Sequence, residues 1–258
     1  MTDPIFSVGE IIKNSYDQTS AGLILGITYG LKNSISKDLY NNFKLAGVSH
    51  MVVFSGANIV IFFSLISKLL SYIKNKLNLL LSSIILIGFL SFMKMDPSIQ
   101  RAIFMWGVIT TAKILNKSTN LLYVLLLSSL FLLILDTSLI ESVSFQLSVL
   151  ALFGILIFNN DVLEINNKSE ILRLIQTTLA AQVFTTPLSY YYFNTFNPLT
   201  LISNILISPL IPFYVFLGIF SPMILTLSKE LNYVFCFLAL ISSQYIVFVL
   251  LFISKFSI

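Results

Sequence analysis

The amino-acid sequence predicts an all-α protein, a polytopic transmembrane helix bundle of about eight segments. The first observation is composition: 57% of the 258 residues are hydrophobic and 10% are charged, whereas soluble domains contain about 25% charged residues. The second is that the apolar residues form runs close to the length of a membrane span. This composition excludes an ordinary cytosolic enzyme, and it excludes a disordered chain, which requires low hydrophobicity and high charge.

Few residues suited to catalysis or metal binding occur in the chain. It contains one cysteine, Cys236, and one histidine, His50, which excludes an internal disulfide and a multi-histidine metal centre. No phosphate-binding loop, zinc-protease helix motif or nucleophile elbow occurs. We therefore expect no cofactor, no metal site, no nucleotide-driven motor and no enzymatic activity.

The N-terminal segment, residues 1–19, is polar, and we separate it from the transmembrane domain predicted over residues 20–258. This segment predicts an amphipathic helix lying on the membrane surface. The apolar residues at helical spacing are Ile5, Val8, Ile11 and Ile12.

Residues 20–31 are apolar but too short to span a bilayer, so they predict a re-entrant, interfacial or buried helix. Gly22, Gly26 and Gly30 share one face of it. Small residues at this spacing let helices approach closely in lipid. The alternative is a glycine-lined passage for the backbone of a ligand.

Longer apolar segments predict the helices that enter or cross the membrane. They are residues 48–70, 77–93, 99–115, 120–135, 143–159, 171–188, 199–227 and 231–253. The segment 199–227 contains Pro209 and Pro212, and it predicts a helix broken at proline because proline removes a backbone donor. Backbone groups freed at membrane depth must face protein or a water-filled cavity. The alternative is a hairpin of two short helices.

The distribution of Lys and Arg predicts that the 48–70 span runs from outside to inside, because the later inside connections are the more basic ones. The first 47 residues oppose this orientation, since they place four lysines on the outside. A second crossing within residues 199–227 would put the C-terminus inside.

Polar residues interrupt the apolar runs in four places, and each needs a partner or a wet cavity. Residues 46–59 contain His50, Ser55 and Asn58, with Gly47 and Gly56 at a helix start or interruption. In residues 95–107, Pro97 begins a helix that Gln100 and Arg101 enter. Residues 142–154 contain Gln146 between Ser144 and Ser148. The fourth group contains Gln182, Pro187 and Asn204.

Two interpretations remain open for these side chains. Hydrogen bonds between helices explain the amides and serines without any ligand. Arg101 lies near a helix end, so it either snorkels to the interface or contacts phosphate through its planar fork. Tyr190, Tyr191 and Tyr192 are typical of interfacial anchors, with base stacking as the alternative.

The four groups, in this order, resemble the competence domain of the ComEC family. The stretch AGVSHMVVFSGANI resembles the landmark of that family, although Ala57 replaces the usual leucine. The further elements are PSIQRAIFMW, SVSFQLSVLALFGI, AQVFTTPLSYYYF and SNILISPLIPF. The resemblance runs from about residue 20 to 225, and more loosely to the C-terminus. It places the chain in the bacterial inner membrane as a multi-pass protein.

The resemblance implies a channel, or a channel component, that passes single-stranded DNA into the cell during natural transformation. The channel-lining candidates are His50, Ser55, Asn58, Gln100, Arg101, Gln146, Gln182 and Asn204. Partners implied are an external DNA receptor, a separate nuclease, a cytosolic helicase-like motor and a second copy of the chain. The OB-like and metallo-β-lactamase-like domains of full-length members do not fit this sequence.

Three rival functions remain at this point. A small-solute permease would use the same broken helix and polar residues, although no inverted repeat is evident. A membrane-embedded enzyme with His50 as base would need acidic partners that the spans lack. A non-transporting assembly subunit is the third.

Overall fold

The computed structural model describes residues 4–52, 56–90, 97–158, 170–193, 197, 199–227 and 229–256. Every regular element within these ranges is a helix, and they contain no β-strand. The all-α prediction is therefore confirmed for this part of the chain. One candidate residue, Ser55, lies outside the described residues.

The chain forms two compact units. Unit 1 contains Met1–Lys94 and Asn197–Ile258, and unit 2 contains the intervening Met95–Phe196. The two ends of the chain therefore fold together, and the middle forms a unit of its own. Because each unit has its own set of helix contacts, the two are described separately.

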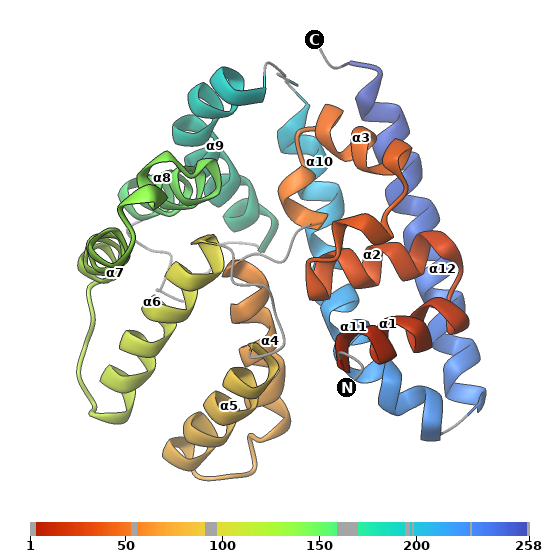
Figure 1. Cartoon of the computed structure of the whole chain (residues 1–258), viewed down its shortest axis with the longest axis horizontal. Coiled ribbons are helices and arrows are strands. Elements are labelled where there is room, and N and C mark those ends of the chain that lie inside the picture. The colour runs from red at the N-terminus through yellow and green to blue at the C-terminus, as the bar shows by residue number, and fades with distance from the viewer. Residues whose placement is uncertain are drawn as a thin grey trace. The chain divides into compact units, whose positions relative to one another are not determined.

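Unit 1 contains the first helices and the last helices of the chain (Figure 1). In chain order they are α1 (Pro4–Ser15), α2 (Gln18–Tyr29), η1 (Lys32–Ser34), α3 (Lys37–Leu45), η2 (Ser49–Val52), α4 (Gly56–Leu69), α5 (Asn75–Leu90), α10 (Thr200–Ile207), η4 (Ser208–Leu210), α11 (Ile211–Leu227) and α12 (Lys229–Ser254).

Helix α1 turns its apolar face toward the core of unit 1. Ile12 is buried, and Val8 packs against the same core. The helix contacts α2 and α11. Ile12 is therefore covered by protein, whereas Ile11 is 39% exposed, and the position on a membrane surface stays a prediction. The separation of residues 1–19 from the rest stays a prediction.

Helix α2 lies at the centre of unit 1. Its sequence is apolar, so it can be buried on all sides. Asp17 caps the N-terminus by accepting a hydrogen bond from the Ser20 amide at 3.1 Å. Gly30 ends the helix with φ of 70°, a left-handed conformation that glycine adopts without a Cβ clash. All residues from Ser20 to Thr28 are buried. Of the three interpretations of residues 20–31, the structure therefore selects the buried helix.

The glycines of α2 allow a loop to pack directly on the helix. A Cβ at Gly22 would lie 2.6 Å from the backbone oxygen of Ser34, and one at Gly26 would lie 2.6 Å from the Ile35 side chain. The close neighbours are thus the η1 loop rather than another membrane helix. The loop can pack this closely only because both positions are glycine and carry no side chain.

Helix α3 ends at a tight turn that delays the next helix. Gly47 has φ of 74°, and the Val48 amide reaches back to the Phe43 oxygen at 2.9 Å. A Cβ at Gly47 would clash with the Thr200 side chain. The chain then forms the 3-10 turn η2, and α4 begins at Gly56. The span expected from residue 48 therefore starts eight residues later (56 against 48).

The proline-containing segment stays helical. Helix α10 passes into the single 3-10 turn η4 and then into α11, and Thr200–Ser221 forms one 22-residue helical stretch. Ser208 and Ile211 both keep right-handed helical angles. Pro209 and Pro212 are exposed. The break is therefore a change to 3-10 geometry, and the segment does not turn back as a hairpin.

Unit 2 contains α6 (Pro97–Ile114), α7 (Leu121–Leu135), η3 (Thr137–Glu141), α8 (Val143–Phe158) and α9 (Glu170–Phe193). The tightest pair is α8 and α9, because a Cβ at Gly154 would lie 2.6 Å from the Phe184 ring. Helix α9 continues through Pro187 to Phe193, so this proline does not end the helix.

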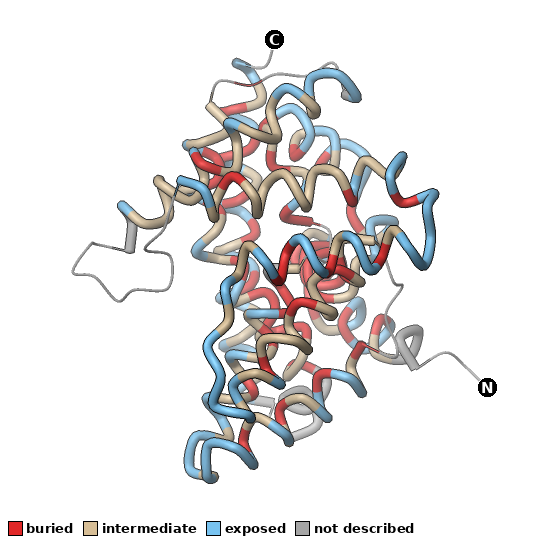
Figure 2. Tube along the Cα trace, turned by 90° about the vertical axis from the view of Figure 1, so that its left-hand side faces the viewer, coloured by how far each residue is buried: buried red, intermediate tan, exposed pale blue. Residues whose placement is uncertain are grey.

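Two helical stretches among the described residues are long and apolar enough to cross a membrane. They are Thr200–Ser221 and Glu230–Ser254. Shorter apolar helices are Asn58–Leu69, Asn75–Leu90, Leu121–Leu135 and Val143–Phe158. Exposed residues, pale blue in Figure 2, occur along helices as well as in turns.

Candidate functional site

Arg101 is a buried cation inside unit 2. It lies in the second turn of α6 with 5% of its surface exposed. One guanidinium nitrogen, Nη2, donates to the Ser148 hydroxyl on α8, and Nη1 contacts Met105 Sδ at 3.2 Å. Arg101 therefore does not snorkel out of unit 2, as one interpretation of the sequence had it, but joins α6 to α8.

The partners of Arg101 leave its charge uncompensated within the described residues. A hydroxyl and a thioether are neutral, and Nε has no hydrogen-bond partner there. The carboxylates of Asp136 and Glu141, also in unit 2, are exposed. Burying a cation without an anion costs folding free energy. The planar fork of Arg101 matches the oxygens of a carboxylate or phosphate.

Gln146 ties the start of α8 to the preceding turn. Its Nε2 donates to the Ile140 oxygen at 2.5 Å, and its Oε1 is buried without a partner among the described residues. The second and third polar groups of the sequence meet in unit 2 through the contact of Arg101 with Ser148, and Gln146 takes no part in that contact. Gln100, on α6, is half-buried.

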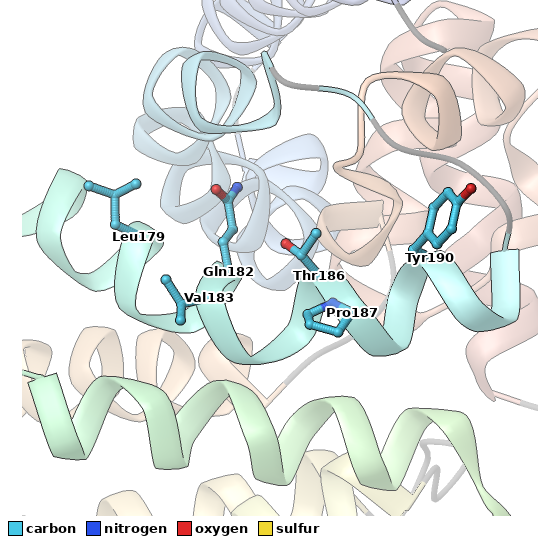
Figure 3. Close-up of a pocket in the computed structure, with 6 residues that line it drawn as sticks. All are labelled: Leu179, Gln182, Val183, Thr186, Pro187 and Tyr190. Carbon is cyan, nitrogen blue, oxygen red and sulfur yellow. The ribbon is translucent and has the colours of Figure 1, made fainter.

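Gln182 lies on a polar stripe of α9 (Figure 3). Its side chain, that of Thr186 and that of Tyr190 extend from the same side of the helix. They line a pocket together with Leu179, Val183 and Pro187. Pro187 has no N–H, so the Val183 oxygen lacks its usual helical donor. Gln182 Nε2 is also buried without a partner among the described residues.

The remaining candidates lie in unit 1 and differ in exposure. His50 is exposed on η2, whereas Asn58 on α4 and Asn204 on α10 are buried. The structure therefore distributes the candidate residues over two units. It brings Arg101 and Ser148 together within unit 2.

The family described as Competence protein matches residues 27–258 of this chain. This chain belongs to the competence protein family. ComE operon protein 3 of Bacillus subtilis (strain 168) is 25% identical over 203 residues, which cover 76% of this chain and 25% of that protein. The chain therefore spans about a quarter of the length of this curated relative. No solved structure matches it significantly.

The competence-family match includes all the polar candidates and most of both units. It begins within α2, so Gly22 and Gly26 lie before it, and Gly30 and Gly47 lie inside it. Pro97 begins α6 as its sequence context predicts, and Gly56 begins α4, although that span was expected from residue 48. The resemblance found in the sequence and the family match therefore cover largely the same stretch of the chain.

Sequence reasoning on this competence-family chain missed the polar contacts that hold unit 1 together. Ser20 donates to Ser243 at 3.0 Å, and the Tyr29 hydroxyl donates to the Gly218 oxygen at 2.7 Å. Asn197 Nδ2 donates to the oxygens of Leu45 and Ile253 at 2.8 and 3.2 Å. Partners more than 50 residues apart leave no local pattern. The one local signal of such a contact was a glycine inside an apolar helix, such as Gly218, which often marks close packing.

Asn58 connects α4 to the C-terminal end of α2. Its Nδ2 donates at 2.8 Å to the Ile27 oxygen, one of the carbonyls that a helix end leaves without a helical donor. We expect Asn58→Leu to lower the free energy of unfolding by about 2 kcal/mol, because that buried carbonyl loses its donor. Thermal unfolding of the purified protein measures this, with the exposed Asn41→Leu as control. Unchanged stability with lost DNA uptake would instead favour a path-lining role for Asn58.

Proposed function

We propose that the chain is a multi-pass component of the bacterial inner membrane that helps pass single-stranded DNA into the cell during natural transformation. The family match over residues 27–258 carries this proposal. The name of the Bacillus subtilis relative, ComE operon protein 3, agrees with it. The channel function and the DNA substrate come from the ComEC resemblance.

Exposed apolar side chains support a location in the membrane. Large hydrophobic residues are exposed on helices of both units, for example Ile84 at 57%, Ile134 at 80% and Phe248 at 70%. Contiguous apolar surface of this kind marks contact with lipid or another apolar partner. The membrane-length stretch Glu230–Ser254 adds to this support.

Arg101 is the proposed phosphate contact. A DNA strand presents one negative charge per nucleotide, and a buried guanidinium with neutral partners attracts such a charge strongly. Ser148 would remain as a hydroxyl donor beside the phosphate. A single cation at the site also lets the strand leave, since conduction requires weak binding.

Along the rest of the path, hydrogen bonds from neutral side chains would guide the DNA strand. We propose that path-lining roles fall to His50, Ser55, Gln100, Gln146, Gln182 and Asn204, with Asn58 the least suited because it is bonded to Ile27. Amide and hydroxyl groups bind phosphate and sugar without sequence preference. The driving force would come from a cytosolic helicase-like motor, with an external DNA receptor, a separate nuclease and a possible second copy as further partners.

Deletion of the gene from its native bacterium tests the proposal. Under conditions that induce competence, we expect nuclease-protected labelled DNA inside the cells to disappear while DNA bound at the cell surface remains. Re-expression of the chain restores the signal. Normal internal DNA in the deletion strain contradicts the proposal, and loss of a small nutrient's transport alone would favour a permease.

A further inference from the structure

Three exposed lysines gather at one end of unit 1. Lys37 and Lys44 lie on α3, and Lys255 follows the last residue of α12. Asn197 hydrogen-bonds both to Leu45 at the end of α3 and to Ile253 near the end of α12. These two helix ends therefore lie side by side, as Figure 1 also shows. We name Lys37, Lys44 and Lys255 the α3-end lysines.

Helix α3 presents a polar face beside these lysines. Its apolar residues Leu39 and Phe43 are buried in unit 1, so they are not available for insertion into lipid. Asn41 is exposed, and Lys44 Nζ lies 5.1 Å from the centre of the half-buried Tyr40 ring. Lysine, amide and aromatic groups on one face are the combination that binds single-stranded nucleic acid.

A second group of exposed lysines lies at the opposite end of α4. This helix starts after η2, next to α3, and its 14 residues extend about 21 Å. The turn from α4 to α5 then carries Lys68, Lys74 and Lys76, all exposed. We name these the α4–α5 lysines. Unit 1 is thus basic at both ends.

Membrane topology explains one of these two groups. The positive-inside rule concentrates Lys and Arg in cytoplasmic loops, and the orientation expected from the sequence puts the α4–α5 lysines there. The same orientation puts the α3-end lysines outside, where the rule predicts few of them. Their presence therefore needs a different cause, and a polyanion arriving from outside supplies one.

We propose that the α3-end lysines are the external docking surface for incoming single-stranded DNA. The identity of the polyanion rests on the proposed function. Binding is electrostatic and independent of sequence, so it weakens as salt rises. Asp38 is the carboxylate on α3, and it leaves the surface positive. Anionic lipid would attract the same lysines, and Leu45 at 37% and Phe256 at 50% exposure lie beside them, so protection of position 44 by oligothymidylate is the result that distinguishes DNA from lipid.

The first experiment determines the side of the membrane. In a Cys236→Ser background, Lys44→Cys is expected to react with an impermeant maleimide in intact cells, and Lys74→Cys only after permeabilisation. Added oligothymidylate should slow labelling at position 44 and not at position 74. Labelling of position 44 only after permeabilisation would overturn the inference.

The second experiment measures initial DNA uptake against DNA concentration in intact cells. The variant Lys37→Gln/Lys44→Gln/Lys255→Gln is compared with the charge-matched Lys68→Gln/Lys74→Gln/Lys76→Gln. Each lost phosphate contact lowers affinity about fivefold at 0.1 M salt. The α3-end variant should therefore need about 100-fold more DNA for half-maximal uptake, with an unchanged maximal rate. The control variant should keep the wild-type concentration dependence.

The outcomes separate this inference from the proposed function. An unchanged half-maximal concentration in the α3-end variant overturns the inference and leaves the proposed function intact. Loss of that variant from the membrane fraction assigns the lysines to membrane assembly, which also overturns it. Absence of uptake by the wild-type chain overturns the proposed function itself.

Discussion

Replacing Arg101 with methionine is expected to reduce DNA uptake about 10- to 100-fold while leaving the protein at least as stable as the wild type. The lost charge-assisted contact to phosphate contributes about 1.5–3 kcal/mol, and each 1.4 kcal/mol is about tenfold. Methionine keeps an unbranched, flexible apolar side chain and removes a buried, uncompensated charge, which is usually neutral or stabilising for folding. Nuclease-protected DNA and thermal unfolding are measured on the same variant.

The opposite directions of the two effects make this test specific. If Arg101 only joins α6 to α8 through Ser148, then Ser148→Ala should lower stability and Arg101→Met should lower it at least as much. Arg101→Lys keeps the charge without the fork, so we expect an intermediate uptake rate. Wild-type uptake by a well-folded Arg101→Met variant would rule out the phosphate contact.

Gly218→Ala is expected to destabilise unit 1 by about 3 kcal/mol. A Cβ at this position would lie 2.5 Å from both carbon atoms of the Thr28 side chain, Cβ and Cγ2. Thr28 must then move and lose its 3.1 Å hydrogen bond to the Tyr214 oxygen. Overpacking costs about 1–3 kcal/mol, and a buried hydrogen bond contributes about 1 kcal/mol more. Thermal or denaturant unfolding of the purified protein measures the change.

A compensating substitution tests whether the loss of stability comes from the contact with Thr28 or from any added side chain on α11. Thr28→Gly removes the three atoms that lie nearest to the new methyl group, so Gly218→Ala/Thr28→Gly should be more stable than Gly218→Ala alone. Gly88→Ala is the matched control, because no neighbouring atom lies within 4 Å of its added Cβ. It should be neutral or stabilising by up to about 1 kcal/mol. Equal losses at positions 88 and 218 would contradict the packing argument.

Helix positions were predictable because each depends on a local pattern. The apolar runs ended at polar residues, and the helices of both units end close to the same places, for example α7 at Leu135 and α8 at Phe158. Pro97 marked the start of α6, as proline commonly does in a first turn. The single misplaced start, residue 48 against Gly56 for α4, has a local cause in the turn at Gly47.

The candidate site was predictable as residue types but not as contacts. Arg101 was predictable as a candidate because a charged side chain within an apolar helix is costly unless it has a partner. Its partner Ser148 lies 47 residues away, and no spacing rule connects them. For Asn58 the sequence suggested a role in lining a DNA path. In the folded chain its side chain instead donates a hydrogen bond to a backbone carbonyl of α2.

The sequence by itself determined the composition of a membrane protein, the places where helices form and the family. These depend on hydrophobic burial and on short-range backbone preferences, which act over a few residues. Only the tertiary structure decided that the chain ends build one unit and the middle another, that α2 is the buried centre, and that Pro187 and Pro209 leave their segments helical. Such outcomes depend on which helix surfaces, distant in sequence, fit together. Close packing is a property of a pair of helices, so it cannot be read from the sequence of either helix alone.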